Sequence, residues 1–171
     1  FVQRRNDEKR QLNPAIEETV VLQLTIDAAA APGRREVRLK TATGISNPIG
    51  FYVDGYPEKS EQEPNDAKAG DAITDSLPVV LNGQIMPGDV DRFRFDAKKG
   101  DKLVMVVLAR QLVPYLADAV PGWFQATLAL YDANNREVAY ADDYQFRPDP
   151  VLYHRVPQDG SYELEIRDSI Y

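Results

Sequence analysis

Apolar and polar residues alternate with a period of two along much of the chain, which is typical of β-strands that bury one face. In the first third, this pattern predicts strands over 20–26, 36–41 and 49–53, with turn residues at 31–34. Further along, the predicted strands cover 79–84, 92–95, 102–109, 127–131, 137–141, 151–156 and 161–167. Gly, Pro and Asn separate these segments, so we expect short turns between them.

Many short strands at spacings of about ten residues predict an all-β fold, an antiparallel β-sandwich or jelly roll with a small N-terminal β segment. The run 102–109 is more continuously apolar, so we expect a central strand buried on both faces. Asn134-Asn135 is a predicted hairpin turn, because Asn tolerates positive φ. Leu112–Val120 is the helical candidate, limited to a turn or two by Pro114 and Pro121.

The charge changes sign along the chain. Residues 1–53 hold eight basic and six acidic residues, a net +2, whereas 54–171 hold 12 basic and 21 acidic residues, a net −9. The segment 55–66 between them is rich in proline and charge, as linkers are. We therefore place a boundary near Pro57, with a charged tail and partial immunoglobulin-like β segment over 1–56 and a β-sandwich over 57–171. Three strands are too few for an independent sandwich, so the first unit must lean on the second or belong to a truncated domain.

Composition excludes several classes of protein. The 171 residues include no cysteine, one histidine and a net charge of −7. Disulfide frameworks, thiol nucleophiles, Cys-ligated zinc and histidine metal clusters are thereby excluded. The acidic balance argues against a nucleic-acid partner, and no apolar run approaches the roughly 18 residues of a membrane span. No signal peptide is recognisable, and the chain ends on the apolar pair Ile170-Tyr171, so we expect a piece of a longer protein.

Catalytic residues are hard to find in the sequence. His154 lies in a strand-like segment, and no serine has the context of a nucleophile elbow. Asp142 and Asp143 are adjacent, so on a strand they point to opposite faces and make a poor acid–base pair. We expect no enzymatic activity from this chain itself, although a peptidase or other hydrolase could be attached to it in the full-length protein. A carboxylate-based hydrolase is the least favoured alternative.

A series of motifs carries a resemblance over residues 58–171. In chain order they are Glu61-Gln62-Glu63-Pro64-Asn65-Asp66, Gly88–Phe95, Leu128–Asn134, Ala141-Asp142-Asp143 and Gly160-Ser161-Tyr162. Together they resemble the bacterial pre-peptidase C-terminal domain, a β-sandwich found beside secreted proteases and in the collagen-binding segments of clostridial collagenases. Residues 33–53 resemble, over a shorter stretch, the closing strands of bacterial immunoglobulin-like domains. The resemblance implies a non-catalytic accessory domain of a larger secreted, periplasmic or cell-surface protein, acting in adhesion, substrate targeting or spacing beside neighbouring domains.

The resemblance also implies a calcium site, because collagen-binding relatives hold calcium with two acidic segments. The matching positions are Glu61, Glu63, Asn65, Asp66, Asp89 and Asp91. Calcium takes six to eight oxygen ligands, which carboxylates and an Asn carbonyl supply. In an extended segment every second side chain points to the same side, which groups the first three positions.

The alternative is a solvated acidic linker, followed by a turn that the two later aspartates shape. The sequence departs from the collagen-binding pattern in its shorter acidic loop and in Pro64. Our hypothesis is that calcium rigidifies the linker and fixes the angle between the units.

Aromatic residues gather between positions 115 and 153. Trp123-Phe124 and Tyr131 are expected in the core, whereas Tyr115, Tyr144 and Phe146 lie in loop-like sequence and are candidates for a ligand surface. Aromatic side chains dominate binding hot spots and stack on sugars. The alternative function is therefore a binding module for an extracellular polysaccharide or fibrous protein.

Overall fold

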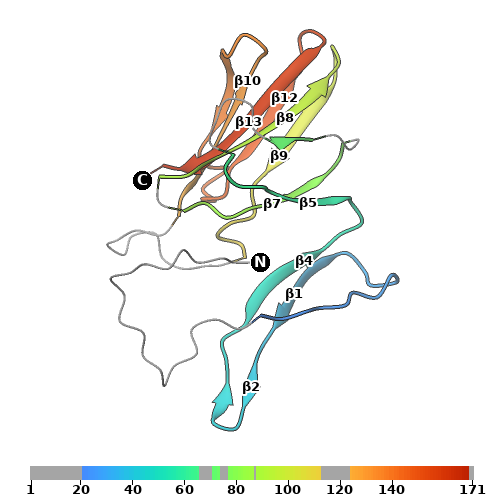
Figure 1. Ribbon diagram of the computed structural model, residues 1–171, viewed down its shortest axis with the longest axis vertical. Helices are drawn as coiled ribbons and strands as arrows, with labels where there is room; N and C mark the ends of the chain where they lie inside the picture. Colours follow the sequence, from blue (N-terminus) through green and yellow to red (C-terminus); the bar gives the residue numbers. More distant parts are fainter. Residues whose placement is uncertain (1–20, 66–70, 74–76, 87, 113–123, 170–171) are drawn as a thin grey trace.

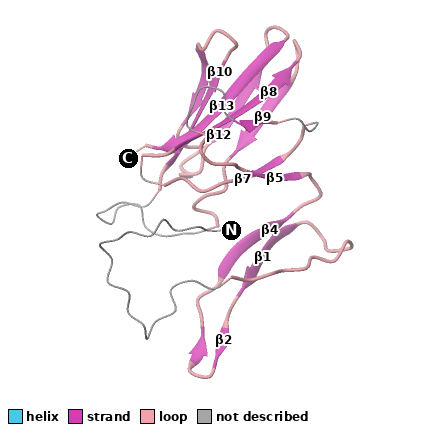
Figure 2. Ribbon diagram, in the orientation of Figure 1, coloured by secondary structure: helices cyan, strands magenta, loops and turns pink. Residues whose placement is uncertain are grey.

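The fold is all-β, as the sequence predicts. The computed structural model describes residues 21–65, 71–73, 77–86, 88–112 and 124–169, and none of these forms a helix (Figure 2). Accordingly, no helix in the described ranges could cross a membrane. The strands are β1 (Gly33–Val37), β2 (Lys40–Thr41), β3 (Gly44–Ile45), β4 (Ile49–Val53), β5 (Glu58–Ser60), β6 (Asp71–Ala72), β7 (Val80–Asn82), β8 (Val90–Ala97), β9 (Lys102–Val106), β10 (Ala126–Tyr131), β11 (Glu137–Ala141), β12 (Val151–Arg155) and β13 (Gly160–Asp168).

Two sheets pack face to face over one apolar core in the second unit (Figure 1). The larger sheet has five strands in the order β11-β10-β13-β8-β6, and the smaller is the antiparallel pair β9-β12. The larger sheet contributes Phe95, Leu130 and Leu164 to the core, and the smaller contributes Leu152 with Met105 packed against it. The arrangement is sandwich-like, and the apolar positions of the alternating pattern supply its core.

The outer face of the larger sheet carries a nearly buried ion-pair network. Arg92 on β8 lies opposite Glu165 on β13 and forms an ion pair with it. Its Nη1 also donates to Glu163 Oε1 at 2.8 Å. The Arg92 guanidinium lies 5.8 Å from the centre of the Tyr131 ring, in cation–π range. Arg92 thus neutralises two carboxylates that the alternation of β13 brings to the same face of the sheet.

Most predicted strands of the second unit are present with shifted ends, and one interpretation is wrong. The turn at 134–135 is confirmed, with Asn135 at a φ of 58°. The segment 102–109, expected to be buried on both faces, forms β9 only to Val106. Its side chains Val104 and Val106 are 63% and 54% exposed. Side chains along β9 alternate between exposed and half-buried, and those of β12 alternate in step, so among the described residues one face of this pair covers the core and the other is open. The helical candidate 112–120 lies outside the described residues except for Leu112, which ends a turn.

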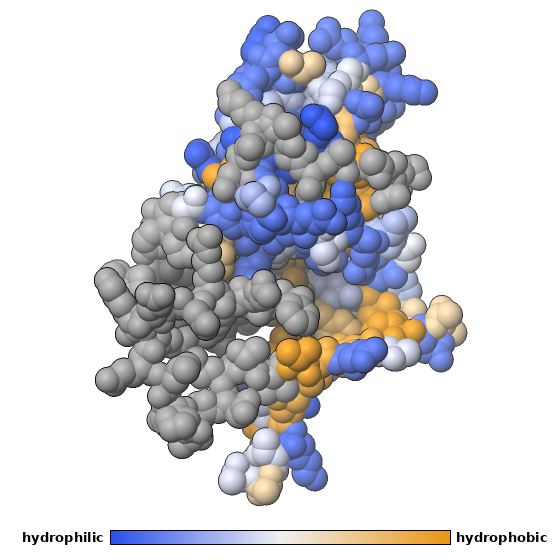
Figure 3. Space-filling model, viewed as in Figure 1, coloured by the Kyte–Doolittle hydropathy of each residue, from blue (hydrophilic) through white to orange (hydrophobic). Residues whose placement is uncertain are grey.

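The first unit differs more from its prediction. The described part of the first predicted strand, 21–26, forms no strand, and Leu24 and Ile26 are half exposed. Apolar alternation produces a strand only where a neighbouring strand accepts its hydrogen bonds. The predicted strand 36–41 is divided between β1 and β2, while β4 has the predicted bounds and pairs with β1. Apolar surface gathers around β1 and β4 on the face that Figure 3 shows.

A loop of the sandwich contacts the first unit. The buried Asp149 carboxylate accepts backbone N–H bonds from Ala109, Arg110 and Gln111, at 3.2, 2.8 and 2.9 Å. The same loop meets β4, where the Tyr52 hydroxyl donates to Gln111 Oε1 at 3.4 Å. Residues on either side of the predicted boundary at Pro57 therefore touch through a side-chain contact as well as through the chain itself.

The Arg92 network predicts a large effect on stability. Replacing Arg92 by Ala leaves Glu165 buried and without this cation, which typically costs about 3–5 kcal/mol. Chemical denaturation should show this loss. Arg94→Ala, at an exposed position on the same strand, should change the free energy of unfolding by less than about 0.5 kcal/mol. Equal effects of the two substitutions would contradict the assignment of the network as a buried one.

Candidate metal centre

Glu61 is held in place by a short parallel pairing that the sequence pattern does not predict. Strand β5 pairs with β7, and the next residue continues the ladder, with the Glu61 N–H donating to Asn82 O at 2.9 Å. The Glu61 side chain reaches the segment after β7, where its Oε1 accepts the Gln84 N–H at 2.7 Å. Two hydrogen bonds therefore fix both the backbone and the carboxylate of Glu61.

Three carboxylates converge at this point. Asp91, the second residue of β8, is only 2% exposed and lies at the end of the strand face that carries Phe93. Oxygen atoms of Glu61, Glu63 and Asp91 all lie within 4.8 Å of one another. Glu63 is oriented by the Asn65 N–H, which donates to its Oε2 at 3.0 Å. Groups that lie 30 positions apart in the sequence thus share one small volume.

Gly83 provides the space for these carboxylates. A Cβ atom at this position would lie 2.4 Å from Glu61 Oε2 and 2.9 Å from Asp91 Oδ2. Both distances are shorter than van der Waals contact, so any side chain here would displace the two carboxylates. Glycine is required at this position for the approach of the ligands and not for its backbone conformation.

Several buried polar atoms of the cluster have no hydrogen-bond partner. Asn65 is 3% exposed, yet neither its Oδ1 nor its Nδ2 is bonded. The same holds for Glu61 Oε2 and Asp91 Oδ1. A buried polar atom without a partner costs about 1–3 kcal/mol, and a charged one costs more. A cation bound by these oxygens would remove that cost for three of the four atoms.

The electrostatics of the cluster also favour a bound cation. Burial raises the pKa of Asp91 from its ordinary 3.8 to about 8, and the nearby Glu61 and Asp89 carboxylates add to the rise. The Asn65 amide lowers the pKa of Asp91 and so offsets part of this rise. Near neutral pH the carboxyl group of Asp91 therefore keeps a proton unless another positive charge replaces it. A metal cation is the natural replacement, because it brings charge and accepts several oxygen ligands together.

The structure places five of the six predicted metal ligands. Glu61, Glu63 and Asp91 come together, and the Asn65 side chain is buried beside Asp91. Asp89 lies close enough to raise the pKa of Asp91. Its own Oδ2, however, accepts the Met86 N–H at 3.0 Å and shapes the turn before β8. The sixth, at position 66, lies outside the described residues.

The ligand set suits a hard cation. Glu61, Glu63 and Asp91 offer carboxylate oxygens, and Asn65 offers a carbonyl oxygen. Calcium accepts six to eight oxygens in irregular geometry, whereas magnesium demands a near-ideal octahedron. Zinc prefers imidazole nitrogen and thiolate sulfur, and none of these side chains supplies either. These oxygens match the ligand preferences of calcium.

Gly83 and Gln84 complete the site and were missed by the sequence reasoning. No pattern in the sequence marks them, because their role depends on carboxylates that arrive from two distant segments.

Two of the predicted ligand-surface aromatics lie on a tight turn. Tyr144 and Arg147 exchange backbone hydrogen bonds of 2.9 and 3.0 Å, which closes a two-residue hairpin loop. The loop residues Gln145 and Phe146 have φ angles of 50° and 65°, a left-handed conformation that costs a bulky residue energy. Phe146 is fully exposed and Tyr144 is exposed beside it. The third aromatic, Tyr115, lies outside the described residues.

The remaining candidates for chemistry stand apart from this cluster. Asp142 and Asp143 are both exposed. His154 is half-buried on β12, and its ring centre lies 6.1 Å from that of Tyr162. Phe124 and Tyr131, expected in the core, are half-buried, and Trp123 lies outside the described residues.

Comparison of the sequence with protein-family models and with curated proteins found no match.

The raised pKa of Asp91 predicts an unusual pH dependence of the metal-free protein. The native carboxyl group, with its pKa of about 8, keeps its proton between about pH 5.5 and 7.5, whereas the unfolded chain, near 3.8, has lost it. The native state then binds more protons than the unfolded state, so stability contributed by this group falls as pH rises. Thermal melts in chelator should show this decline.

Asp91→Asn should flatten the decline, because the amide does not titrate. Asp96→Asn, an exposed position on the same strand, should leave it unchanged. Identical slopes of Tm against pH for the wild type and Asp91→Asn would contradict the prediction.

Proposed function

We propose that this chain is a calcium-stabilised, non-catalytic accessory region of a larger secreted bacterial protein, acting in adhesion, substrate targeting or spacing. One observation carries the calcium part of the proposal. Glu61, Glu63 and Asp91 converge around Gly83, beside the buried and unpaired side chain of Asn65. The accessory role and its bacterial, extracellular setting rest on the resemblance of the motifs over 58–171 to the pre-peptidase C-terminal domain.

The metal would act structurally, as a link between the linker and the sandwich. Glu61 and Glu63 follow β5 at the end of the linker, whereas Asp91 belongs to β8 in the larger sheet. A cation held by all three ties the linker to a central strand, which limits the movement of the unit before it. Bound calcium supplies positive charge and coordination to these oxygens, and no chemical step is assigned to it.

A carboxylate hydrolase is supported less well by the same residues. Such an enzyme needs a carboxyl group of raised pKa, and Asp91 has one. The Asp91 side chain, however, is almost completely buried, so a substrate has no access to its carboxyl group. The geometry suits a cation that enters the cluster better than a polymer that lies across it.

Thermal melting with and without calcium tests the proposal. Calcium modules of extracellular proteins have Kd values of about 0.1–1 mM, so about 10 mM calcium should add roughly 1.5–2.7 kcal/mol of stability over chelator. For a chain of this size, that corresponds to a rise in Tm of about 3–11 °C. An unchanged Tm would rule out calcium binding to the folded state.

Variants assign the effect to this cluster. Asp91→Asn removes a ligand charge, and Gly83→Ala places a methyl group among the ligands, so both should abolish the calcium-dependent rise. Gly83→Ala keeps every carboxylate and therefore tests the geometry separately from the charge. Asp96→Asn should keep the full rise, because its side chain is exposed on the opposite face of β8. A full rise in Gly83→Ala would place the ion elsewhere.

The alternative function is a binding module for carbohydrate or fibrous protein that uses the 144–147 turn. It is favoured by the full exposure of Phe146 in a left-handed turn, since strained residues often mark functional sites.

Binding to collagen, peptidoglycan and neutral polysaccharides should then fall by about 30-fold when Phe146 or Tyr144 is replaced by Ala, as for a hot-spot aromatic worth about 2 kcal/mol. Tyr56→Ala, another exposed aromatic, is the control. Equal binding by the turn variants and the control would remove the turn from the function.

A further inference from the structure

The open face of the β9-β12 pair combines exposed apolar side chains with basic ones. Its outward side chains form three cross-strand rows, which are Lys102 with Arg155, Val104 with Tyr153, and Val106 with Val151. Val104 is 63% exposed and Tyr153 is 59% exposed. The face is therefore basic at one end and apolar along the rest, with one aromatic ring beside the basic row.

The basic row is an unfavourable pairing within a sheet. Lys102 and Arg155 are direct partners in the antiparallel register, and like charges in such positions are destabilising. Across the described part of the chain, no acidic group forms an ion pair with either of them, nor with Lys99 nearby. Asp101 and Asp159 lie at this end of the face, but their carboxylates accept the backbone N–H groups of Lys98 and Lys99, at 2.9 and 2.7 Å. Three unpaired cations at one end of this face therefore indicate an anionic ligand.

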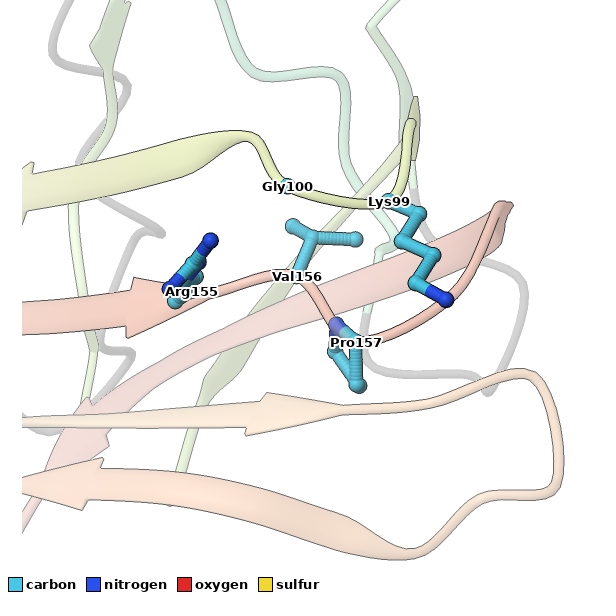
Figure 4. A pocket seen from close by; sticks show the side chains of 5 residues that line it. All are labelled: Lys99, Gly100, Arg155, Val156 and Pro157. Atoms are coloured by element: carbon cyan, nitrogen blue, oxygen red, sulfur yellow. The ribbon is translucent and has the colours of Figure 1, made fainter.

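A cavity adjoins the basic row. It has a volume of about 520 Å³ and is lined by Lys99, Gly100, Arg155, Val156 and Pro157 (Figure 4). This is within the range of about 300–1,000 Å³ that small ligands occupy. The Gly100 N–H donates to Val156 O at 2.8 Å, and the Val156 N–H donates to Asp101 O at 2.9 Å. The Lys99 N–H donates to Asp159 Oδ1 at 2.7 Å, so these three backbone N–H groups are satisfied, and the charged side chains among the lining residues are those of Lys99 and Arg155.

We propose that this face and its cavity bind sugar rings that carry carboxylate or sulfate groups, as in an acidic polysaccharide. Lys99, Lys102 and Arg155 are hydrogen-bond donors without acceptor capacity, so they select oxygen-rich anionic groups. Tyr153 lies in the next row, about 7 Å along the strand, where a sugar ring can stack on it. The proposal does not depend on the metal centre, which involves neither of these strands.

An acidic peptide fits the same surface less well. A peptide also presents backbone N–H donors, and a face whose cations only donate leaves them without partners. The hydroxyl groups of a sugar both donate and accept, and they can remain in water at the rim. The peptide is therefore an outcome of the test and not the proposed ligand.

Isothermal titration of the full chain in chelator tests the proposal with four probes at about 50 mM salt, where charge interactions are little screened. The probes are polygalacturonate, heparin, dextran and polyglutamate. We expect binding to polygalacturonate, to heparin or to both, and none to dextran. The two anionic sugars distinguish carboxylate from sulfate recognition. Absence of binding to both, or equally tight binding of polyglutamate, overturns the proposal.

Variants separate binding from folding. Arg155→Glu should weaken binding at least tenfold while Tm stays the same or rises, because the new carboxylate faces Lys102 in place of a like charge. Tyr153→Ala should weaken binding without changing its dependence on salt. Arg94→Glu makes the same charge change on an exposed position of the other sheet and should retain binding. Unaltered binding by Arg155→Glu, or an equal loss in Arg94→Glu, overturns the assignment. A calcium-dependent rise in Tm without any sugar binding would overturn the proposal for this surface and leave the calcium proposal standing.

Discussion

Strand β8 connects the parts of the sandwich through the alternation of its side chains. On one face Phe95 and Ala97 enter the core, and Asp91 lies at the end of the same face. On the other face Arg92 neutralises the carboxylates of β13. Because successive side chains of a strand point to opposite faces, a single register positions the core, the ion-pair network and the candidate metal ligands together. A slip of one residue would bury Arg92 in the core and expose Asp91.

The candidate metal centre is a local conflict within this otherwise consistent strand. Its carboxylates are brought together at the edge of an apolar core, where burial disfavours charge and neighbouring acids repel. Two agents relieve that conflict, a proton on Asp91 or a cation shared by the cluster. A proton on Asp91 lowers the local charge and can be donated to Glu61, whereas a cation would also provide a partner for the unbonded Oδ1 of Asn65. Metal binding and protonation therefore compete for the same oxygen atoms.

The alternating pattern predicts strands well where a partner strand exists and fails where none does. The segments of β10, β11 and β13 were predicted to within a residue or so, since each pairs along its length with a neighbour. Residues 21–26 have an equally clear pattern but form no strand. Strand β7 lies within the predicted strand 79–84, whereas β5 and β6 were missed, because parallel pairing over two or three residues is too short for a period to be recognised. The open face of β9 was missed for a related reason, because an apolar run does not reveal whether anything covers it.

The sequence by itself determined the all-β class and most strands of the second unit. It also marked the two acidic segments, which contain the five ligand candidates that the structure describes. These follow from local periodicity and from residue chemistry, which are properties of neighbouring positions. Only the tertiary structure decided that Gly83 makes room for Glu61 and Asp91, that Asn65 is buried without a partner, and that Lys102 faces Arg155. Each of these depends on strand register and on packing between distant segments, so no local pattern could contain it.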